Sequence, residues 1–239
     1  MARYKRIMLK VSGEHLAGKD GVGADGAALK VLAEEIRILV KKKIQVAVVV
    51  GGGNFWRFRD NSGLRLARSV SDSVGMLATM MNASLLTEAL NQTGVKAFAL
   101  ATHADGYYAY NYSPELGKKI LNDGGVVICA GGTGNPYFTT DSAAALRALE
   151  LQCAVLLKDT KVEGVYDKDP LKHKNAKFFP KISYAEVLKR ELQIMDQTAI
   201  VLCKENGLPV LVFQGKRGNL LRAASGKKIG TLITARSAA

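Results

Sequence analysis

The segment at 131–141 combines glycines, threonines and an aspartate in a pattern typical of a phosphate-binding loop. Its sequence, Gly-Gly-Thr-Gly-Asn-Pro-Tyr-Phe-Thr-Thr-Asp, lies between an apolar run at 126–130 and an alanine-rich run at 142–150. A strand–loop–helix unit places such a loop at the carboxyl edge of a parallel sheet, where α/β proteins bind ligands. Glycine amides, threonine hydroxyls and the positive end of the next helix all attract anions. The segment therefore predicts a phosphorylated ligand.

The final residue of this segment, Asp141, puts a carboxylate where an anion should bind. Its presence implies that a lysine or a metal ion lies close by. A plainer interpretation is a glycine-rich turn in which Thr140 or Asp141 caps the following helix. Because the segment is longer than a tight turn requires, we favour the functional interpretation.

Two more glycine-rich segments follow predicted strands. The first is Lys-Val-Ser-Gly at 10–13, and the second is Gly-Gly-Gly-Asn at 51–54. The first offers a lysine and backbone amides to a phosphate chain, and the second offers three consecutive amides without side chains. Each is weak evidence alone, since glycines are common in turns. Together with Asp141, and with Lys158 at the end of another strand, they predict a site for two phosphorylated ligands that face each other.

Several familiar nucleotide-binding motifs are excluded. The run Gly-Val-Gly-Ala-Asp-Gly at 21–26 matches the dinucleotide pattern by letter, but it lies well after its strand. The next strand ends in glycines instead of the acid that binds ribose. The sequence contains no P-loop motif and no protein-kinase motif.

Composition describes an ordinary globular chain of 239 residues, 48% hydrophobic and 23% charged, with a net charge of +13. The basic residues are dispersed over helix ends and loops and are not interleaved with aromatics, which disfavours a nucleic-acid partner. No apolar run is long enough for a membrane span, and we expect no signal peptide. The three cysteines lack metal-type spacing, so we expect small core residues in a reduced cytoplasm.

Strand and helix patterns alternate along the chain. We expect strands at 4–11, 45–50, 96–101, 126–130, 154–158, 210–213 and 230–234, and helices at about 25–42, at about 71–91, from 113, at 142–150, from 183 and after 196. The segment at 160–180 is expected to be irregular. Such alternation predicts an α/β fold whose mostly parallel sheet has helices on both faces. No internal repeat or linker divides the chain, so we expect a single domain over 1–239.

The chain resembles the bacterial uridylate (UMP) kinases of the amino-acid-kinase family over nearly its whole length, from Lys5 to Thr234. Within that family, Asn-Pro-Tyr-Phe-Thr-Thr-Asp at 135–141 and Gly-Met-Leu-Ala-Thr at 75–79 are specific to these kinases. The other matching segments are 10–14, 51–54 with Arg57, Asp72, 81–82, Gly134, 160–166, 169–170 and 195–196.

The resemblance implies a three-layer αβα sandwich, with an acceptor-binding lobe at about 1–150 and an ATP-binding lobe at about 151–239. It also implies reversible in-line phosphoryl transfer from ATP to UMP, giving UDP and ADP, in pyrimidine nucleotide biosynthesis. The partners that it implies are ATP with Mg²⁺, UMP and further copies of the chain in a homohexamer. No protein ligand for the Mg²⁺ is implied, because the ATP phosphates carry the ion.

Residue roles follow from the matching motifs. The catalytic set would be Lys10, Arg57, Asp141 and Lys158. The ATP set would be Lys10, Ser12, Gly13, Gly53, Arg57, Thr160, Tyr166 and Asp169. The UMP set would be Gly52, Asp72, Thr133, Gly134, Asn135, Pro136, Tyr137, Phe138, Thr139 and Thr140. Asp141 resembles the family aspartate that orients the catalytic lysine.

Elementary chemistry agrees with this reaction. A phosphate monoester has a second pKa of about 6, so UMP is mostly a dianion at neutral pH and needs no general base. Positioning and charge neutralisation then govern the transfer, and lysines, amides and Mg²⁺ supply both. We expect direct transfer without a phosphoenzyme.

Some alternatives stay open at the level of sequence. The second phosphate-binding lysine could be Lys158 or Lys161, and Asp159 puts a negative charge where the family usually has a small residue. Asp72 could be a partner of the helix dipole, and Tyr166 a plain strand residue. The acceptor could be CMP, a carboxylate or a carbamate, and a non-catalytic nucleotide-binding or nucleic-acid-binding protein is the rival class. Activation by GTP and inhibition by UTP are not decided.

Two further assignments concern residues outside the predicted site. Asp196 belongs to a matching motif but could equally be a helix N-cap, so it is left out of the catalytic set. The methionines at 76, 80 and 81 are interpreted as core packing at helical spacing.

Overall fold

The computed structural model describes residues 3–18, 20–57 and 63–235. Its main strands are β1 (Arg6–Val11), β2 (Gln45–Val50), β3 (Ala97–Ala101), β4 (Tyr110–Asn111), β5 (Val126–Ala130), β6 (Val155–Thr160), β9 (Lys181–Ser183), β10 (Val210–Gln214) and β11 (Thr231–Thr234). They form one sheet in the order β4-β3-β5-β2-β1-β6-β10-β11-β9. Every neighbouring pair is parallel except β10 and β11.

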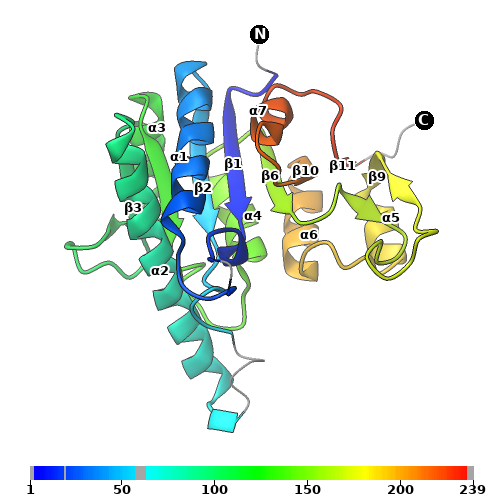
Figure 1. Ribbon diagram of the computed structural model, residues 1–239, viewed down its shortest axis with the longest axis horizontal. Coiled ribbons are helices and arrows are strands. Elements are labelled where there is room, and N and C mark those ends of the chain that lie inside the picture. Colours follow the sequence, from blue (N-terminus) through cyan, green and yellow to red (C-terminus); the bar gives the residue numbers. More distant parts are fainter. Residues whose placement is uncertain (1–2, 19, 58–62, 236–239) are drawn as a thin grey trace.

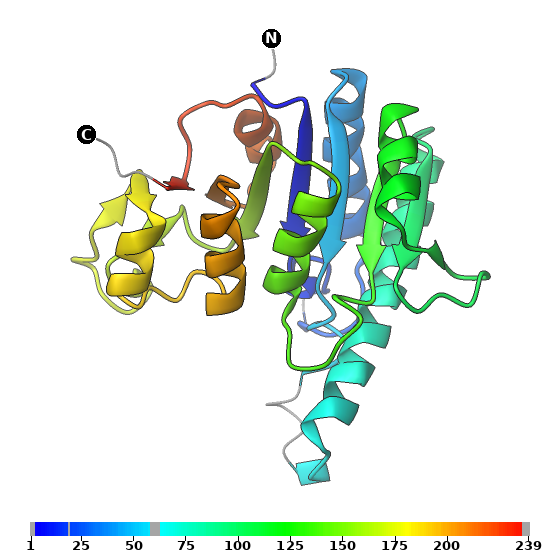
Figure 2. The same ribbon diagram turned by 180° about the vertical axis from the view of Figure 1, so that it is seen from behind.

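Helices cover both faces of this sheet, which Figures 1 and 2 show from opposite sides. One face packs against α1 (Gly26–Lys41), α2 (Arg68–Gln92) and α7 (Asn219–Ala224). The opposite face packs against α3 (Pro114–Asn122), α4 (Thr140–Glu150), α5 (Tyr184–Lys189) and α6 (Gln197–Glu205). A separate apolar core fills each interface. The predicted αβα sandwich with a mostly parallel sheet is therefore confirmed.

Side chains of β1 alternate between the two cores. Ile7, Leu9 and Val11 belong to the core under α1, α2 and α7, whereas Met8 belongs to the core under α4. Successive side chains of a strand point to opposite faces, and a parallel sheet covered on both sides is apolar on both. By the same alternation Lys10 points toward α4.

The predicted elements are present with small shifts at their ends, but some features differ from the expectation. The long helix α2 begins at Arg68 and not near residue 71. The segment at 160–180 contains two short strands, β7 (Val165–Tyr166) and β8 (Phe178–Phe179), which pair antiparallel. The sequence pattern predicts neither these strands nor β4, β9 and α7, because strands of two or three residues are too short to show an alternation and a six-residue helix covers less than two turns.

Three predicted helix starts are confirmed by their caps. Ser113, Ser183 and Asp196 each accept a hydrogen bond from the backbone N–H three residues further along the chain. This is the usual way in which a short polar side chain satisfies the first turn of a helix. All three cysteines are buried, as their apolar surroundings predict.

The first turns of α2 extend past the carboxyl edge of the sheet, toward which the arrows of β1 and β2 point in Figure 1. The loops after β1, β2 and β5 gather at this edge. Among the residues that the structure describes, no helix is long and apolar enough to cross a membrane. The fold therefore presents one crowded sheet edge, flanked by α2, as the place to look for a site.

Candidate functional site

The three glycine-rich loops meet at one edge of the sheet, as predicted. They follow β1, β2 and β5, which are neighbours in the sheet and run parallel to one another. Since the carboxyl ends of parallel strands share an edge, loops that are far apart in sequence become adjacent. The η1 turn (Gly13–His15), a single 3-10 turn, continues the first of these loops.

Two lysines and one aspartate form the centre of this edge. Lys10 on β1 and Lys158 on β6 are register partners in the parallel pair. The Nζ of Lys10 lies 2.9 Å from Oδ1 of Asp141, and the Nζ of Lys158 lies 2.6 Å from its Oδ2. All three side chains are largely buried. The expected lysine partner of Asp141 is therefore present twice.

The charges of this cluster shift the ionisation of its members. Burial opposes ionisation of Asp141, but the ammonium groups of Lys10 and Lys158 outweigh it and hold the pKa of this carboxyl below its ordinary value. Burial, and then the positive charge of Lys10, lower the pKa of Lys158 despite the attraction of Asp141. One buried carboxylate thus holds two buried ammonium groups together, which leaves a local excess of positive charge.

The start of α4 holds Asp141 in place. The N-cap of α4 is Thr139, whose hydroxyl accepts the backbone N–H of Asp141. The alternative in which Thr140 or Asp141 is the cap is therefore wrong. Asp196 at the start of α6 accepts hydrogen bonds from the hydroxyls of Thr139 and Ser142. This carboxylate both caps its own helix and ties the two helix starts together.

Close backbone packing explains the glycines of the first two loops. A Cβ on Gly13 would lie 2.4 Å from Oδ1 of Asn54 and 2.8 Å from the backbone nitrogen of Gly53. The buried side chains of Asn54 and Asn82 exchange two hydrogen bonds, and Asn82 also donates to the carbonyl of Gly51. These contacts fix the loop after β2 between the η1 turn and α2.

A cavity of about 350 Å³, here called the α2 cavity, lies between α2 and the loops after β2 and β5. Seven of the ten residues predicted to bind UMP line it, namely Gly52, Asp72, Thr133, Asn135, Phe138, Thr139 and Thr140. The sequence patterns do not identify seven other lining residues, namely Trp56, Arg68, Ser71, Gly75, Met76, Thr79 and Gly132, of which three belong to the quoted Gly-Met-Leu-Ala-Thr string.

The other three predicted members do not line the α2 cavity. Gly134 has a φ of +85° and packs against Thr102, whose Oγ1 would lie 2.7 Å from a Cβ at this position. Tyr137 has a φ of +71° and its side chain is exposed. Pro136 lies between them in the loop. These residues shape the loop backbone without lining the cavity.

Asp72 joins α2 to the loop after β5. Its carboxylate accepts hydrogen bonds from the Nε of Arg68 at 2.8 Å and from the backbone N–H of Tyr137 at 2.8 Å. Because α2 begins at Arg68, Asp72 is outside the first turn, and the interpretation as a first-turn dipole partner is wrong. The interpretation of the methionines as core is confirmed for Met80, which packs against the core under α1, α2 and α7. It is wrong for Met76, which lines the α2 cavity, and for Met81, which is exposed.

A second cavity of about 540 Å³, here called the β7 cavity, lies on the other side of the lysine pair. Thr160, Tyr166 and Asp169, the predicted adenosine-side residues, all line it. The segment between α5 and α6, including Gln193 and Ile194, forms part of its wall. No sequence motif marks Gln193 or Ile194. The structure thus brings the predicted ATP residues of the irregular segment to one place.

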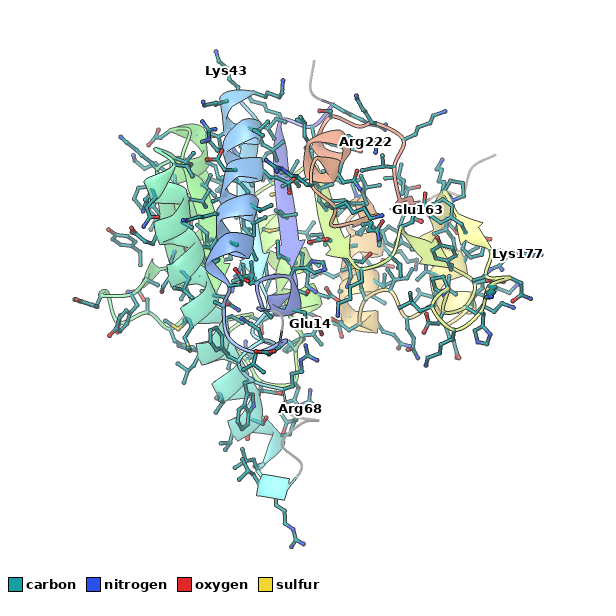
Figure 3. All side chains as sticks on the ribbon, in the orientation of Figure 1. Glu14, Lys43, Arg68, Glu163, Lys177 and Arg222 are labelled. Carbon is teal, nitrogen blue, oxygen red and sulfur yellow. The ribbon has the colours of Figure 1, made fainter. Side chains whose placement is uncertain are left out.

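Glu14 of the η1 turn lies between two cations of this edge. Its carboxylate contacts the guanidinium of Arg57 at 2.5 Å and the ammonium of Lys161 at 2.5 Å. Arg57 also donates from Nε to the carbonyl of Gly53. In Figure 3, Glu14 lies below the carboxyl end of β1, while Arg68 lies further out at the start of α2. Lys161 is thus held by Glu14, and Lys158 is the lysine that reaches Asp141.

Asp159 is turned away from the lysine pair. Its Oδ2 lies 2.5 Å from Nδ1 of His15, the last residue of the η1 turn. This places the unusual acid of the sequence opposite a basic partner. Within the described parts of the chain, no three His, Cys, Asp or Glu side chains are grouped to hold a metal ion.

Comparisons with known proteins match this geometry. The model of the amino acid kinase family matches residues 5–214. The structure of a UMP kinase from Bacillus anthracis superposes with a TM-score of 0.95 at 32% identity, covering 98% of each chain. A UMP kinase from Ureaplasma parvum gives 0.91 at 36% identity, covering 97% of this chain and 99% of its own. A uridylate kinase from Archaeoglobus fulgidus gives 0.75 at 25% identity, covering 98% of this chain and all of its own.

Proposed function

The chain belongs to the amino acid kinase family, and from that premise we propose that it is a UMP kinase. It transfers the γ-phosphoryl group of ATP to UMP, giving UDP and ADP, in a reversible in-line reaction. The two bacterial UMP kinases above are more than 30% identical to it over nearly the full length of both chains, which supports this acceptor. The reaction serves pyrimidine nucleotide biosynthesis in the cytoplasm.

The observation that carries the proposal is the position of the lysine pair between two cavities. Thr140, which lines the α2 cavity, directly precedes Asp141 in the chain. Thr160, which lines the β7 cavity, follows Lys158 by two residues. A phosphoryl group that passes from one cavity to the other would therefore cross the excess positive charge that Asp141 holds in place. UMP occupies the α2 cavity in this proposal, and the adenosine of ATP occupies the β7 cavity.

The chemistry needs charge neutralisation more than proton transfer. UMP is largely a dianion at neutral pH, so the attacking oxygen needs no base. Lys10 and Lys158 stabilise the charge on the oxygens of the transferred group, which is where phosphoryl transfer gains most of its rate. Asp141 is a positioning residue for both lysines. Mg²⁺ enters bound to the ATP phosphates, as part of the substrate.

The remaining residues divide by ligand. Gly53 and Arg57 are assigned to ATP although they line the α2 cavity, so they would lie where the phosphates of the two ligands meet. The backbone amides of Ser12, Gly13 and Gly53 hold the β- and γ-phosphates. Arg57 leaves its ion pair with Glu14 and binds the phosphoryl group that is transferred. Thr160, Tyr166 and Asp169 contact the adenosine. The UMP side uses Gly52, Asp72 and the loop at 133–140, in which Gly134, Pro136 and Tyr137 set the backbone shape. The acceptor lobe spans about 1–150 and the ATP lobe about 151–239 of one domain.

Self-association into a homohexamer is also proposed. The exposed side of α2 carries apolar side chains four residues apart, Leu77, Met81 and Leu85, which are 61%, 50% and 41% exposed. A continuous apolar stripe of this kind is typical of a surface that another protein chain covers. Light scattering coupled to size-exclusion chromatography tests it, and a monomer at micromolar concentration would contradict it.

An acceptor comparison tests the function. The purified chain is given ATP with Mg²⁺ and, in separate reactions, UMP, CMP, glutamate or carbamate, while ADP formation is followed. Turnover with UMP well above that with CMP supports the proposal. Turnover with glutamate or carbamate instead would assign the chain to another branch of its family. Salt-sensitive binding to DNA with no nucleotide turnover would favour the non-catalytic class.

A further inference from the structure

Asp159 lies on the opposite face of β6 from the lysine pair. Strand alternation separates its side chain from that of Lys158, and its register partner on β10 is Phe213, which belongs to the core under α1, α2 and α7. Asp159 nevertheless directly precedes Thr160, which lines the β7 cavity. A carboxylate therefore lies next to the region that the donor phosphates would enter.

The two oxygens of the Asp159 carboxylate differ in their contacts. Its Oδ2 lies 2.5 Å from Nδ1 of His15, and the two side chains are only 13% and 23% exposed. Its Oδ1 is buried and has no hydrogen-bond partner among the described residues. A Cβ on residue 215 would lie only 2.0 Å from that oxygen, so the carboxylate packs against the backbone of Gly215. His15 is thus the basic group that compensates a nearly buried charge.

Other charged groups near the pair do not replace His15. Glu35 on α1 faces the same region, where burial chiefly, and the charge of Asp159 in addition, raise its pKa. The backbone N–H of Gly218 and the charge of Arg217 act in the opposite direction on Glu35. With two carboxylates close together, loss of the imidazole would leave a net negative charge behind the phosphate-binding turn.

The position of His15 in the chain connects this charge to the site. His15 ends the η1 turn, and the same turn begins with Gly13, which packs against the backbone of Gly53. We propose that His15 is a positioning residue, whose imidazole neutralises Asp159 and ties the turn that binds the donor phosphates to β6. This inference rests on the proposed kinase function. The pair acts on the affinity for ATP, whereas UMP lies on the far side of the lysine pair.

The test is a double-mutant cycle read as separate KM values. H15A is expected to raise the KM for ATP about tenfold, which corresponds to about 1.4 kcal/mol, while the KM for UMP changes less than about twofold. Adding D159N removes the unpaired charge, so the double variant should return to within about threefold of the wild-type KM for ATP. D159N alone should change the KM for ATP only slightly, because the variant has no buried carboxylate that His15 must neutralise.

A second variant separates the charge of His15 from its hydrogen bond. H15N keeps a hydrogen-bonding group without the charge, so it should raise the KM for ATP by about as much as H15A. The double variant H15N/D159N should return toward the wild-type KM for ATP.

Several outcomes would overturn the inference. An unchanged KM for ATP in H15A would do so, and so would a double variant no better than H15A, because a merely structural contact would not be rescued. Equal increases in both KM values would also contradict it. If H15A does not fold, the KM values for ATP of H15N and H15N/D159N decide the matter. An absence of UMP-dependent turnover in the wild-type chain would instead refute the proposed function, and binding of ATP to the same variants would then test the pair.

Discussion

Lys10 and Lys158 are register partners on adjacent parallel strands, and their ammonium groups contact opposite oxygens of one carboxylate. The pairing is possible because both residues occupy the same phase of the strand alternation and so face α4. The start of α4 then brings Asp141 over both. Two like charges held this close by a single counter-charge are unfavourable for the folded chain alone, and they form a site that a phosphate would complete.

The first prediction concerns Lys10. Replacing it with alanine removes a charge that stabilises the transferring group, so kcat/KM for UMP phosphorylation should fall at least about a hundredfold. Lys227→Ala, at an exposed position away from both cavities, is the matched control and should stay within about twofold of wild type. Steady-state kinetics with ATP and UMP measure both. Near-normal turnover in Lys10→Ala would show that the site is misassigned.

The second prediction concerns Asp141. Asp141→Asn leaves two buried ammonium groups without a counter-charge, which should lower the free energy of unfolding by about 3 kcal/mol at pH 7. Since the folded-state pKa of Asp141 is below its ordinary value of 3.8, this stabilisation is present above that value and is lost as the pH falls through the folded-state pKa.

Urea unfolding at pH 7 and at successively lower pH measures the loss. The difference in the free energy of unfolding between wild type and Asp141→Asn should become smaller below about pH 4. Asp123→Asn is the control, since Asp123 forms an exposed pair with Lys119 and should cost less than about 1 kcal/mol. A difference in the free energy of unfolding that stays constant with pH would be inconsistent with an ion-paired Asp141.

The third prediction separates stability from activity at Lys158. Lys158→Met removes the repulsion with Lys10 and fills the space with an apolar side chain, so the free energy of unfolding should rise by about 1 kcal/mol at pH 7. The same variant should lose most of its kcat, because Lys158 no longer stabilises the transferred group. Because burial and Lys10 lower the folded-state pKa of Lys158, its protonated form disfavours folding. Wild-type stability should therefore recover relative to the variant as the pH rises from that pKa toward 10.5.

Chemical denaturation of both proteins between neutral and alkaline pH, together with kcat, checks this prediction. Lys161→Met is the comparison, because Lys161 is largely exposed and paired with Glu14. It should change stability by less than about 0.5 kcal/mol. A loss of stability in Lys158→Met would mean that the attraction to Asp141 outweighs burial and repulsion.

The fourth prediction concerns Gly52. A Cβ there would lie 2.8 Å from the Cβ of Ala78 and 2.8 Å from the carbonyl oxygen of Gly75, both on α2. Gly52→Ala should therefore destabilise the fold by about 2 kcal/mol and raise the KM for UMP, because the loop must move away from α2. Gly26→Ala, where a Cβ meets nothing within 4 Å, should be neutral or slightly stabilising. Thermal unfolding and steady-state kinetics compare the two.

The amino-acid sequence by itself determined the fold class and the parts of the site. Alternating strand and helix patterns predict the parallel sheet, because connections between parallel strands need helices on its faces. Parallel strands also place the loops that follow them at one edge, which is why three glycine-rich segments could be assigned to one site. A carboxylate in an anion-binding loop implied a basic partner for Asp141. All of these inferences depend on local pattern or on rules of chain direction.

Only the tertiary structure decided which side chains meet. The choice of Lys158 over Lys161 as the partner of Asp141 depends on the register between β1 and β6. Sequence does not encode this register, because the buried cores of both strands are apolar on either face. The direction of Asp159 depends on the same alternation, and its contact with His15 on the approach of the η1 turn. Part of the wall of the β7 cavity comes from the segment between α5 and α6, which has no regular structure. Such contacts arise from packing between distant segments, which no local pattern records.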